Sequence, residues 1–238
     1  MSRSSNNVVL KTPCVRFYEW SGSEGKLRYY DKEAGAAVFV ELPFSFLVLD
    51  RLHTVSGYCD AERSGFWGNE VRDSVRDPIT VRTRAGVVAS GIWKQLPAIT
   101  GLKYAQSIYI AFKNENDQLV IGNIKGSGAF VSAWIEFCKG KNPYDGSIAI
   151  SSAAEARKGA TKYFTPVFGT RPVKPETDAT AKDLDMQLQE YLEAYFKRHT
   201  LLRAADAAVG LPHADEPPAE YHEAPAEWPE PPADWQDW

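Results

Sequence analysis

The stretch that decides the fold reads Ser107-Ile-Tyr-Ile-Ala-Phe112, then Asn114-Glu-Asn-Asp117, then Leu119-Val-Ile-Gly-Asn-Ile124. Two short runs rich in β-branched and aromatic residues flank a polar turn, which is the pattern of a β-hairpin. Similar runs recur on both sides of this hairpin and are separated by Gly, Pro or Asn. Strands at this spacing predict an all-β barrel or sandwich.

The same pattern predicts strands over most of the first 170 residues. We expect further hairpin turns at Arg84-Ala-Gly86 and Arg157-Lys-Gly159. The remaining runs that we expect to form strands are Lys26–Tyr30, Ala36–Val40, Phe44–Asp50, Leu52–Tyr58, Ile79–Arg84, Val87–Trp93, Ser147–Ser152 and Tyr163–Phe168.

Two helices are predicted from 3.6-residue periodicity. Ser127–Lys139 places Phe130, Ala133, Trp134 and Phe137 on one face, and Gly140 ends it. Thr180–Arg203 follows a linker at Pro172–Pro175 and has acidic residues early and basic residues late, which suits the helix dipole. Whether this second helix packs on the barrel or on another copy is left open. Its apolar stripe consists of Leu184, Leu188, Tyr191, Leu192, Tyr195 and Phe196.

Composition places the chain among ordinary globular proteins. It has 238 residues, 44% hydrophobic and 24% charged, and its apolar runs are too short to cross a membrane. The first residues lack the apolar segment of a secretory signal. Cys14, Cys59 and Cys138 are an odd and widely spaced set, which favours neither disulfides nor a zinc site. We therefore expect a cytoplasmic protein.

The charge is distributed unevenly. Residues 212–238 hold eight acidic residues and no Lys or Arg, so the net charge of −4 becomes +4 when this acidic tail is set aside. Seven of the 15 prolines lie in the tail, which predicts disorder. The tail also holds three of the seven tryptophans, and aromatic anchors among acids suit docking to a partner. The expected partner-binding residues are Trp228, Asp234, Trp235, Asp237 and Trp238.

Catalytic motifs are missing from the sequence. The chain has no phosphate-binding loop with its lysine, no H-E-x-x-H, no G-x-S-x-G and no zinc-ligand spacing. The acids between Asp50 and Asp77 are interleaved with arginines, which favours a salt-bridged surface over a metal site. We expect no catalytic residue, no metal and no cofactor.

Aromatic and basic side chains alternate through the β-rich region. Single-strand binders need cations for phosphates and aromatic rings for base stacking, each ring contributing about 1–3 kcal/mol. Phe66 and Trp67 lie between Gly65 and Gly68, which predicts an exposed loop, whereas alternation places Tyr18 and Tyr29 in the core. The candidate DNA-binding residues are Trp20, Arg28, Tyr30, Arg63, Phe66, Trp67, Arg72, Arg82, Arg84, Trp93, Lys103, Tyr104, Lys158 and Lys162.

Several segments resemble phage single-stranded DNA-binding proteins with an OB fold. They are Phe46–Asp50 with Val55–Tyr58 and Ser64–Val71, then Ser107–Ala111 with Lys125–Phe137, and finally Lys158–Phe168. The acidic tail that ends in an aromatic residue is similar to the replisome-docking tails of such proteins. The resemblance spans about residues 15–200. It implies a protein that covers single-stranded DNA in replication, recombination or repair and recruits other proteins through its tail.

The sequence thus predicts an OB-fold-like barrel with an internal helix and a C-terminal helix, followed by a disordered tail. The expected parts are a DNA-binding domain at 1–170, a linker and amphipathic helix at 171–211, and the acidic tail at 212–238. The expected partners are single-stranded DNA and replication or recombination proteins, with homo-oligomerisation on DNA left open and no membrane. The alternatives are a β-rich protein-interaction module and a metal-dependent nuclease that uses the acids of residues 60–77.

Overall fold

The computed structural model describes residues 10–209 of the chain, and the side chains of residues 10–200. In chain order, its elements are β1 (Arg16–Ser21), β2 (Lys26–Asp31), β3 (Ala36–Val40), β4 (Phe44–Cys59), the 3-10 turn η2 (Asp60–Glu62), β5 (Ser64–Gly65), β6 (Trp67–Gly68), β7 (Ile79–Thr83), β8 (Gly86–Gly91), the 3-10 turn η3 (Trp93–Gln95), β9 (Leu102–Lys113), β10 (Leu119–Ser127), α1 (Gly128–Cys138), β11 (Ser147–Lys158), β12 (Thr161–Arg171) and α2 (Pro175–Val209).

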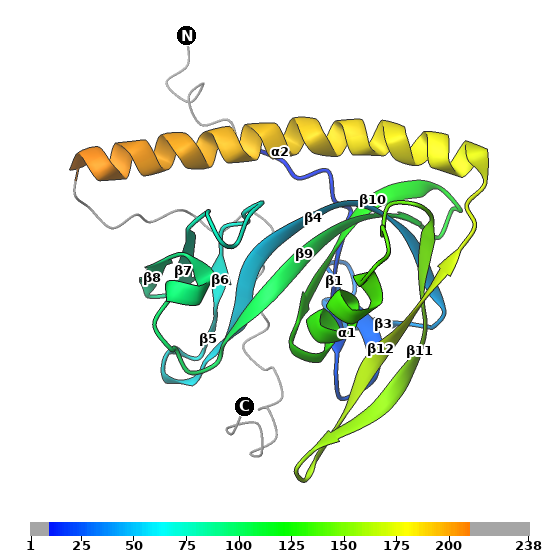
Figure 1. Cartoon of the computed structure of the whole chain (residues 1–238), viewed down its shortest axis with the longest axis horizontal. Coiled ribbons are helices and arrows are strands. Elements are labelled where there is room, and N and C mark those ends of the chain that lie inside the picture. Colours follow the sequence, from blue (N-terminus) through cyan, green and yellow to red (C-terminus); the bar gives the residue numbers. More distant parts are fainter. Residues whose placement is uncertain (1–9, 210–238) are drawn as a thin grey trace.

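A large mixed sheet forms the body of the protein (Figure 1). Its strands lie in the order β12-β11-β4-β9-β10-β1-β2-β3, and β5 pairs with the end of β4. Neighbours on this path are antiparallel except β1 and β10, which run parallel. A separate small sheet has the order β6-β7-β8. The prediction of a mainly β fold with two helices is therefore confirmed.

The described strands leave the large sheet open, so the predicted barrel is not confirmed. The strand order ends at β12 on one side and at β3 on the other. The backbone N–H of Phe164 in β12 donates to the carbonyl of Gly22, between β1 and β2, at 2.8 Å. The indole Nε1 of Trp20 donates to the carbonyl of Phe164 at 2.9 Å. These contacts bring β12 to the β1–β2 turn without a ladder of paired residues.

The predicted hairpins are confirmed at the three expected turns. β9 and β10 pair from Leu119 opposite Lys113 onward, and β11 and β12 form one long hairpin. The runs predicted as two strands on either side of Arg51 form one strand, β4. A register shift between Val48 and Asp50 accommodates an extra residue there, so the strand continues through the irregular position.

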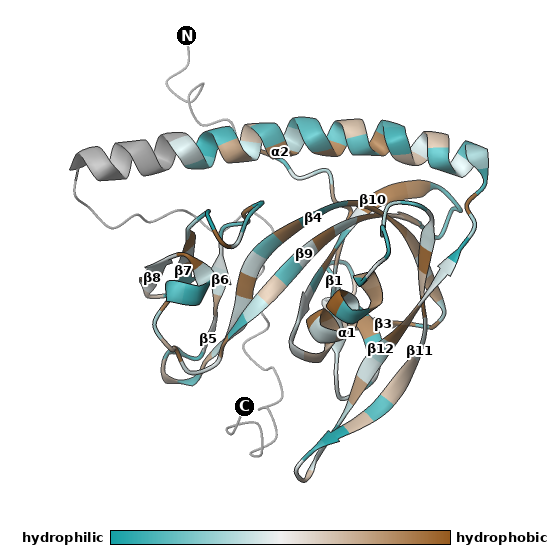
Figure 2. Cartoon of the chain, viewed as in Figure 1, coloured by the Kyte–Doolittle hydropathy of each residue, from teal (hydrophilic) through white to brown (hydrophobic). Residues whose placement is uncertain are grey.

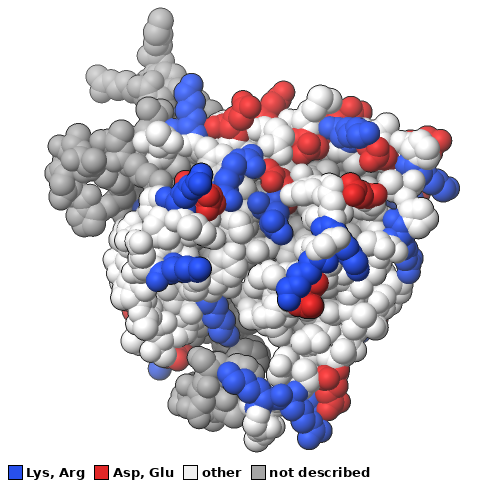
Figure 3. Space-filling model, in the orientation of Figure 1, with Lys and Arg blue, Asp and Glu red and all other residues white. Residues whose placement is uncertain are grey.

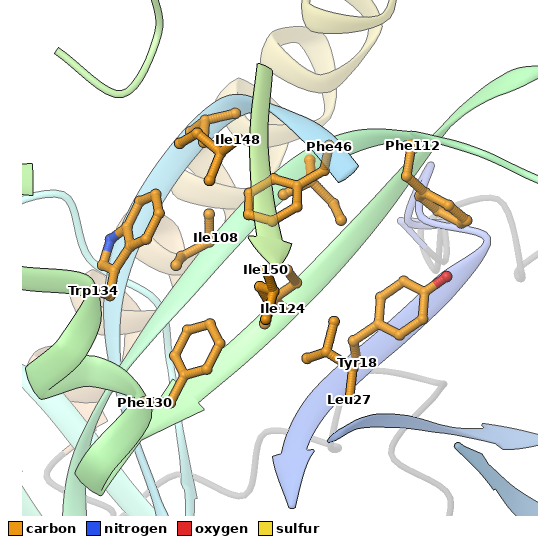
Figure 4. Packing of buried hydrophobic residues seen from close by; sticks show 12 residues of the cluster. Tyr18, Leu27, Phe46, Ile108, Phe112, Ile124, Phe130, Trp134, Ile148 and Ile150 are labelled. Atoms are coloured by element: carbon orange, nitrogen blue, oxygen red, sulfur yellow. The ribbon is translucent and has the colours of Figure 1, made fainter. Parts of the chain in front are cut away.

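Helix α1 closes one face of the sheet. Phe130 and Trp134 are 1% and 0% exposed and belong to one buried cluster with Tyr18, Ile108 and Ile148 (Figure 4). The predicted helix over Ser127–Lys139 is confirmed to within a residue at each end. The rings of Trp134 and Phe168 meet edge to face at 5.3 Å, which joins α1 to β12.

Helix α2 packs on the opposite face of the sheet. It starts at Pro175, inside the expected linker, because proline suits the first turn of a helix. Leu188 and Leu192 are fully buried against Leu49 and Leu52 of β4, and apolar residues alternate with polar ones along α2 in Figure 2. The helix thus packs on the sheet of its own chain. Within residues 10–209, no helix joins the length and the apolar composition that crossing a membrane requires.

Candidate nucleic-acid interface

The two faces of the sheet differ at the strands β1, β2 and β3. Tyr18 and Leu27 point toward α1 and are 2% and 0% exposed. Their neighbours Phe17 and Arg28 point to the other face, because successive side chains of a strand alternate. The described part of α2 contacts β4 and β10 on that face. It therefore covers the middle of the sheet.

One cross-strand row connects the covered part of this face to its exposed edge. Leu52 of β4 lies under α2 and pairs with Ser107 of β9. The row then continues across β10, β1, β2 and β3, and its further members are Lys125, Glu19, Arg28 and Phe39. Phe39 is 43% exposed, so the row ends at an open aromatic ring.

A second row carries two more exposed aromatic rings. Asn123 of β10 pairs with Phe17 of β1, and Tyr30 lies two residues from Arg28 on the same side of β2. Phe17 and Tyr30 are 44% and 42% exposed. Large aromatic side chains left open on one sheet face are more informative than scattered surface residues. We name the set Phe17, Arg28, Tyr30, Phe39 and Lys125 the aromatic face.

Cations on and beside the aromatic face lie close to carboxylates. Arg28 Nη2 is 2.6 Å from Glu19 Oε1, and Lys26 Nζ is 2.5 Å from Glu41 Oε1. Burial lowers the pKa of Lys125, and the carboxylates of Glu70 and Glu19 act in the opposite direction. The surface therefore combines apolar rings with positive and negative groups, which suits a polar and partly aromatic ligand.

Of the predicted DNA-binding residues, Arg28 and Tyr30 lie on the aromatic face. Trp20 lies on the other side of β1, where its ring centroid is 6.2 Å from that of Phe130. Phe17, Phe39 and Lys125 were not among the predicted site residues. The signal for Phe17 was available, because placing Tyr18 in the core by alternation puts its neighbour on the opposite face.

The predicted exposed loop at Phe66 is wrong. Phe66 is 4% exposed and packs with Val55 and Ile79 in the core of the small sheet. Gly68 is required by packing rather than by a loop, since a Cβ there would lie 2.8 Å from Val55 Cγ2. Trp67 is half-buried in β6. It pairs across the strands with Arg82, which is only 7% exposed.

Trp93, Lys103 and Tyr104 gather near the β8–β9 connection. The rings of Trp93 and Tyr104 are 5.5 Å apart, and the Tyr104 hydroxyl contacts His53 Nδ1. Burial lowers the pKa of Lys103. Trp93 also borders a hollow of about 440 Å³ with Leu96 and Ile99. This group lies on η3 and β9, whereas the residues of the aromatic face lie on β1, β2, β3 and β10.

Three predicted arginines have defined surroundings. The backbone N–H of Arg84 donates to Ser64 Oγ at 3.0 Å, which brings the β7–β8 turn next to Arg63. Arg72 forms a salt bridge with Asp50 at 3.0 Å and donates to Gln189 of α2 at 3.1 Å. The described contacts of Arg72 therefore tie α2 to the sheet.

The β11–β12 hairpin carries the last two predicted residues, Lys158 and Lys162. Its lower end is hydrophilic in Figure 2, and Lys and Arg side chains gather there in Figure 3. Lys162 and Arg157 both contact Glu155, at 2.8 and 3.3 Å. The hydrogen bond from Lys162 lowers the pKa of Glu155. This basic tip is a second surface suited to phosphates.

Within residues 10–209, no three His, Cys, Asp or Glu side chains are grouped to hold a metal ion. The acids proposed for the nuclease alternative have structural contacts: Asp77 Oδ2 accepts from the backbone N–H of Asp73 at 3.0 Å, and Glu70 Oε2 accepts from the Tyr109 hydroxyl at 2.6 Å.

Comparison of the chain with models of protein families, with curated proteins and with solved structures finds no match. The predicted partner-binding residues 228–238 lie outside the described part of the chain.

Proposed function

We propose that this protein binds single-stranded DNA without catalysis and uses the aromatic face as its base-stacking surface. The observation that carries the proposal is the group of three rings, Phe17, Tyr30 and Phe39, each 42–44% exposed on one side of adjacent strands. Arg28 and Lys125 lie in the row that ends at Phe39. Rings that stack on bases, next to positively charged side chains, are what a surface for single strands needs.

The basic tip of the β11–β12 hairpin supports the same proposal. Arg157, Lys158 and Lys162 outnumber the one carboxylate, Glu155, that contacts two of them. A strand stacked on the aromatic face carries a phosphate for every base, so further cations elsewhere on the surface increase its attraction to the protein. In this proposal the protein covers single-stranded DNA during replication, recombination or repair, and its acidic tail recruits partner proteins.

The resemblance to phage single-stranded DNA-binding proteins favours this assignment over a protein-interaction module. An exposed aromatic patch alone suits either ligand, because aromatic residues are also enriched at protein interfaces. The neighbouring cations and the basic hairpin tip are the features that a polyanion requires and a protein partner does not.

A salt titration tests the proposal. Full-length protein is titrated into a labelled single strand of mixed sequence, with a duplex of the same sequence as the control. About four to six phosphate contacts predict a log–log slope of roughly −3 to −4 for a single strand. Equal affinity for the duplex, or binding that does not change with salt, contradicts the proposal. Cleavage of the strand after divalent metal is added supports the nuclease alternative.

A further inference from the structure

An ion pair lies within the aromatic face. Arg28 Nε and Nη2 lie 2.7 and 2.6 Å from the same carboxylate oxygen, Oε1 of Glu19. The two side chains are 25% and 49% exposed, so the pair is open to solvent from the outside. In the cross-strand row, Glu19 stands between Lys125 and Arg28, and Phe39 follows Arg28.

This arrangement is poorly suited to phosphate binding alone. A carboxylate between two cations repels a phosphate and weakens the field that would attract it. Contacts to phosphates also carry no sequence information, because they do not distinguish one base from another. The position of Glu19 beside exposed rings suits the edge of a stacked base instead.

The pair presents a defined hydrogen-bonding pattern. The carboxylate only accepts, and the guanidinium only donates through several N–H groups. Side by side they offer an acceptor next to donors. The pairing edge of cytosine has the complementary order, with a donor at N4 and acceptors at N3 and O2. Thymine presents an acceptor, a donor and an acceptor at O4, N3 and O2, so its N3–H and one carbonyl can meet the pair, but only cytosine matches an acceptor followed by two donors.

We infer that Glu19 and Arg28 read a base edge on the aromatic face and favour cytosine over thymine. Glu19 accepts from the cytosine N4 amino group, and Arg28 donates to both N3 and O2, which is one contact more than thymine can make with the same pair. Both bonds of the existing pair end on Oε1, so neither engages Oε2 of Glu19. The inference rests on the proposed function, because it assigns a base preference to the same surface.

The test compares oligo-dC with oligo-dT of one length, at mildly alkaline pH where oligo-dC stays unpaired. Full-length wild type is expected to bind oligo-dC about fivefold more tightly or better, as one well-placed pair of base contacts allows. Glu19→Ala removes the acceptor and one negative charge. It is expected to bind oligo-dT more tightly than wild type does and to bring the ratio of the two affinities close to one.

Glu41→Ala is the matched control. Glu41 pairs with Lys26 at 2.5 Å beside the same rows, and its side chain is 81% exposed. This substitution removes the same charge, so affinity for both oligonucleotides should rise while their ratio is kept. Equal wild-type affinity for oligo-dC and oligo-dT overturns the base preference and leaves the proposed function standing. A ratio that survives Glu19→Ala overturns the role of Glu19. No binding to any single strand, the mixed sequence included, contradicts the proposed function itself.

Discussion

The strands β1 and β2 present two faces made from neighbouring residues of similar type. Tyr18 is 2% exposed and packs among the rings under α1, whereas Phe17, the residue before it, is 44% exposed. The same contrast separates Leu27 from Arg28. The inner side of both strands belongs to the buried cluster that includes α1, whereas α2, on the other side, contacts β4 and β10. Aromatic residues under α1 contribute to stability, and those on the opposite face are 42–44% exposed.

The largest effect is expected from a change under α1. Trp134 is fully buried, and Trp134→Ala should lower the free energy of unfolding by about 3–5 kcal/mol. Denaturant unfolding measures this decrease. Trp134→Phe is the control, because it retains a ring and removes an indole N–H that lacks a partner among the described residues. A small decrease in the free energy of unfolding with Trp134→Ala would mean that packing of α1 contributes little to the stability of the sheet.

Phe66 is expected to behave like a residue under α1, although its sequence resembles a loop. Because it is 4% exposed in the core of the small sheet, Phe66→Ala should also lower the free energy of unfolding by about 3–5 kcal/mol. Thermal melts measure the loss of stability, and binding titrations measure any change in affinity for DNA. If Phe66→Ala weakened DNA binding at unchanged stability, the ring would have to leave this core to meet a base.

The sequence predicted the elements better than the coverage of their faces. Most strands, the three hairpin turns and both helices follow from local periodicity, and alternation correctly buried Tyr18, but β1 (Arg16–Ser21) was not among the predicted runs. Which face stays open depends on where α2 lies, and that packing joins β4 to residues more than a hundred positions later. Phe66 was misplaced because a glycine needed for close packing, Gly68, looks like a glycine needed for a turn. The arrangement of Phe17 and Phe39 in rows with Arg28 requires the register, which no local pattern provides.

Changes on the aromatic face should reverse the pattern expected under α1. Phe17→Ala, Tyr30→Ala and Phe39→Ala are each expected to weaken single-strand binding by about 1–3 kcal/mol. The melting temperature should change little, since these rings are exposed. Val88→Ala, at a similarly exposed apolar residue of β8, is the control. Wild-type affinity in all three variants would remove the aromatic face from the proposed interface.

The hairpin tip should contribute a smaller and purely electrostatic effect. Lys158→Ala with Lys162→Ala is expected to reduce the salt slope of binding by about 0.7 for each phosphate of a single strand that the variant no longer neutralises. Any base preference should stay the same, because cations that bind phosphates do not read sequence. Lys182→Ala on α2, where Lys182 pairs with Asp178, is the control. An unchanged slope would exclude the tip from the DNA path.

The smallest effect concerns His53, which the register places on the α1 side of β4, two residues from the Arg51–Ile108 pair. Burial, with help from Arg51, lowers the pKa of His53 below its ordinary value of 6.5. The unfolded chain therefore binds a proton more readily than the folded one. Stability should be fully present above pH 6.5 and fall as the pH drops below it, until the folded-state pKa is passed. Melting temperatures of wild type and His53→Gln across this range measure the effect, and the variant should show a smaller acid-side decline.

Since His53 lies off the aromatic face, the same substitution should leave single-strand affinity at neutral pH unchanged. A variant that keeps the full pH dependence of stability would show that another group carries it. A weaker affinity in His53→Gln would contradict this expectation and would mean that a change on the α1 side of the sheet affects binding at the aromatic face.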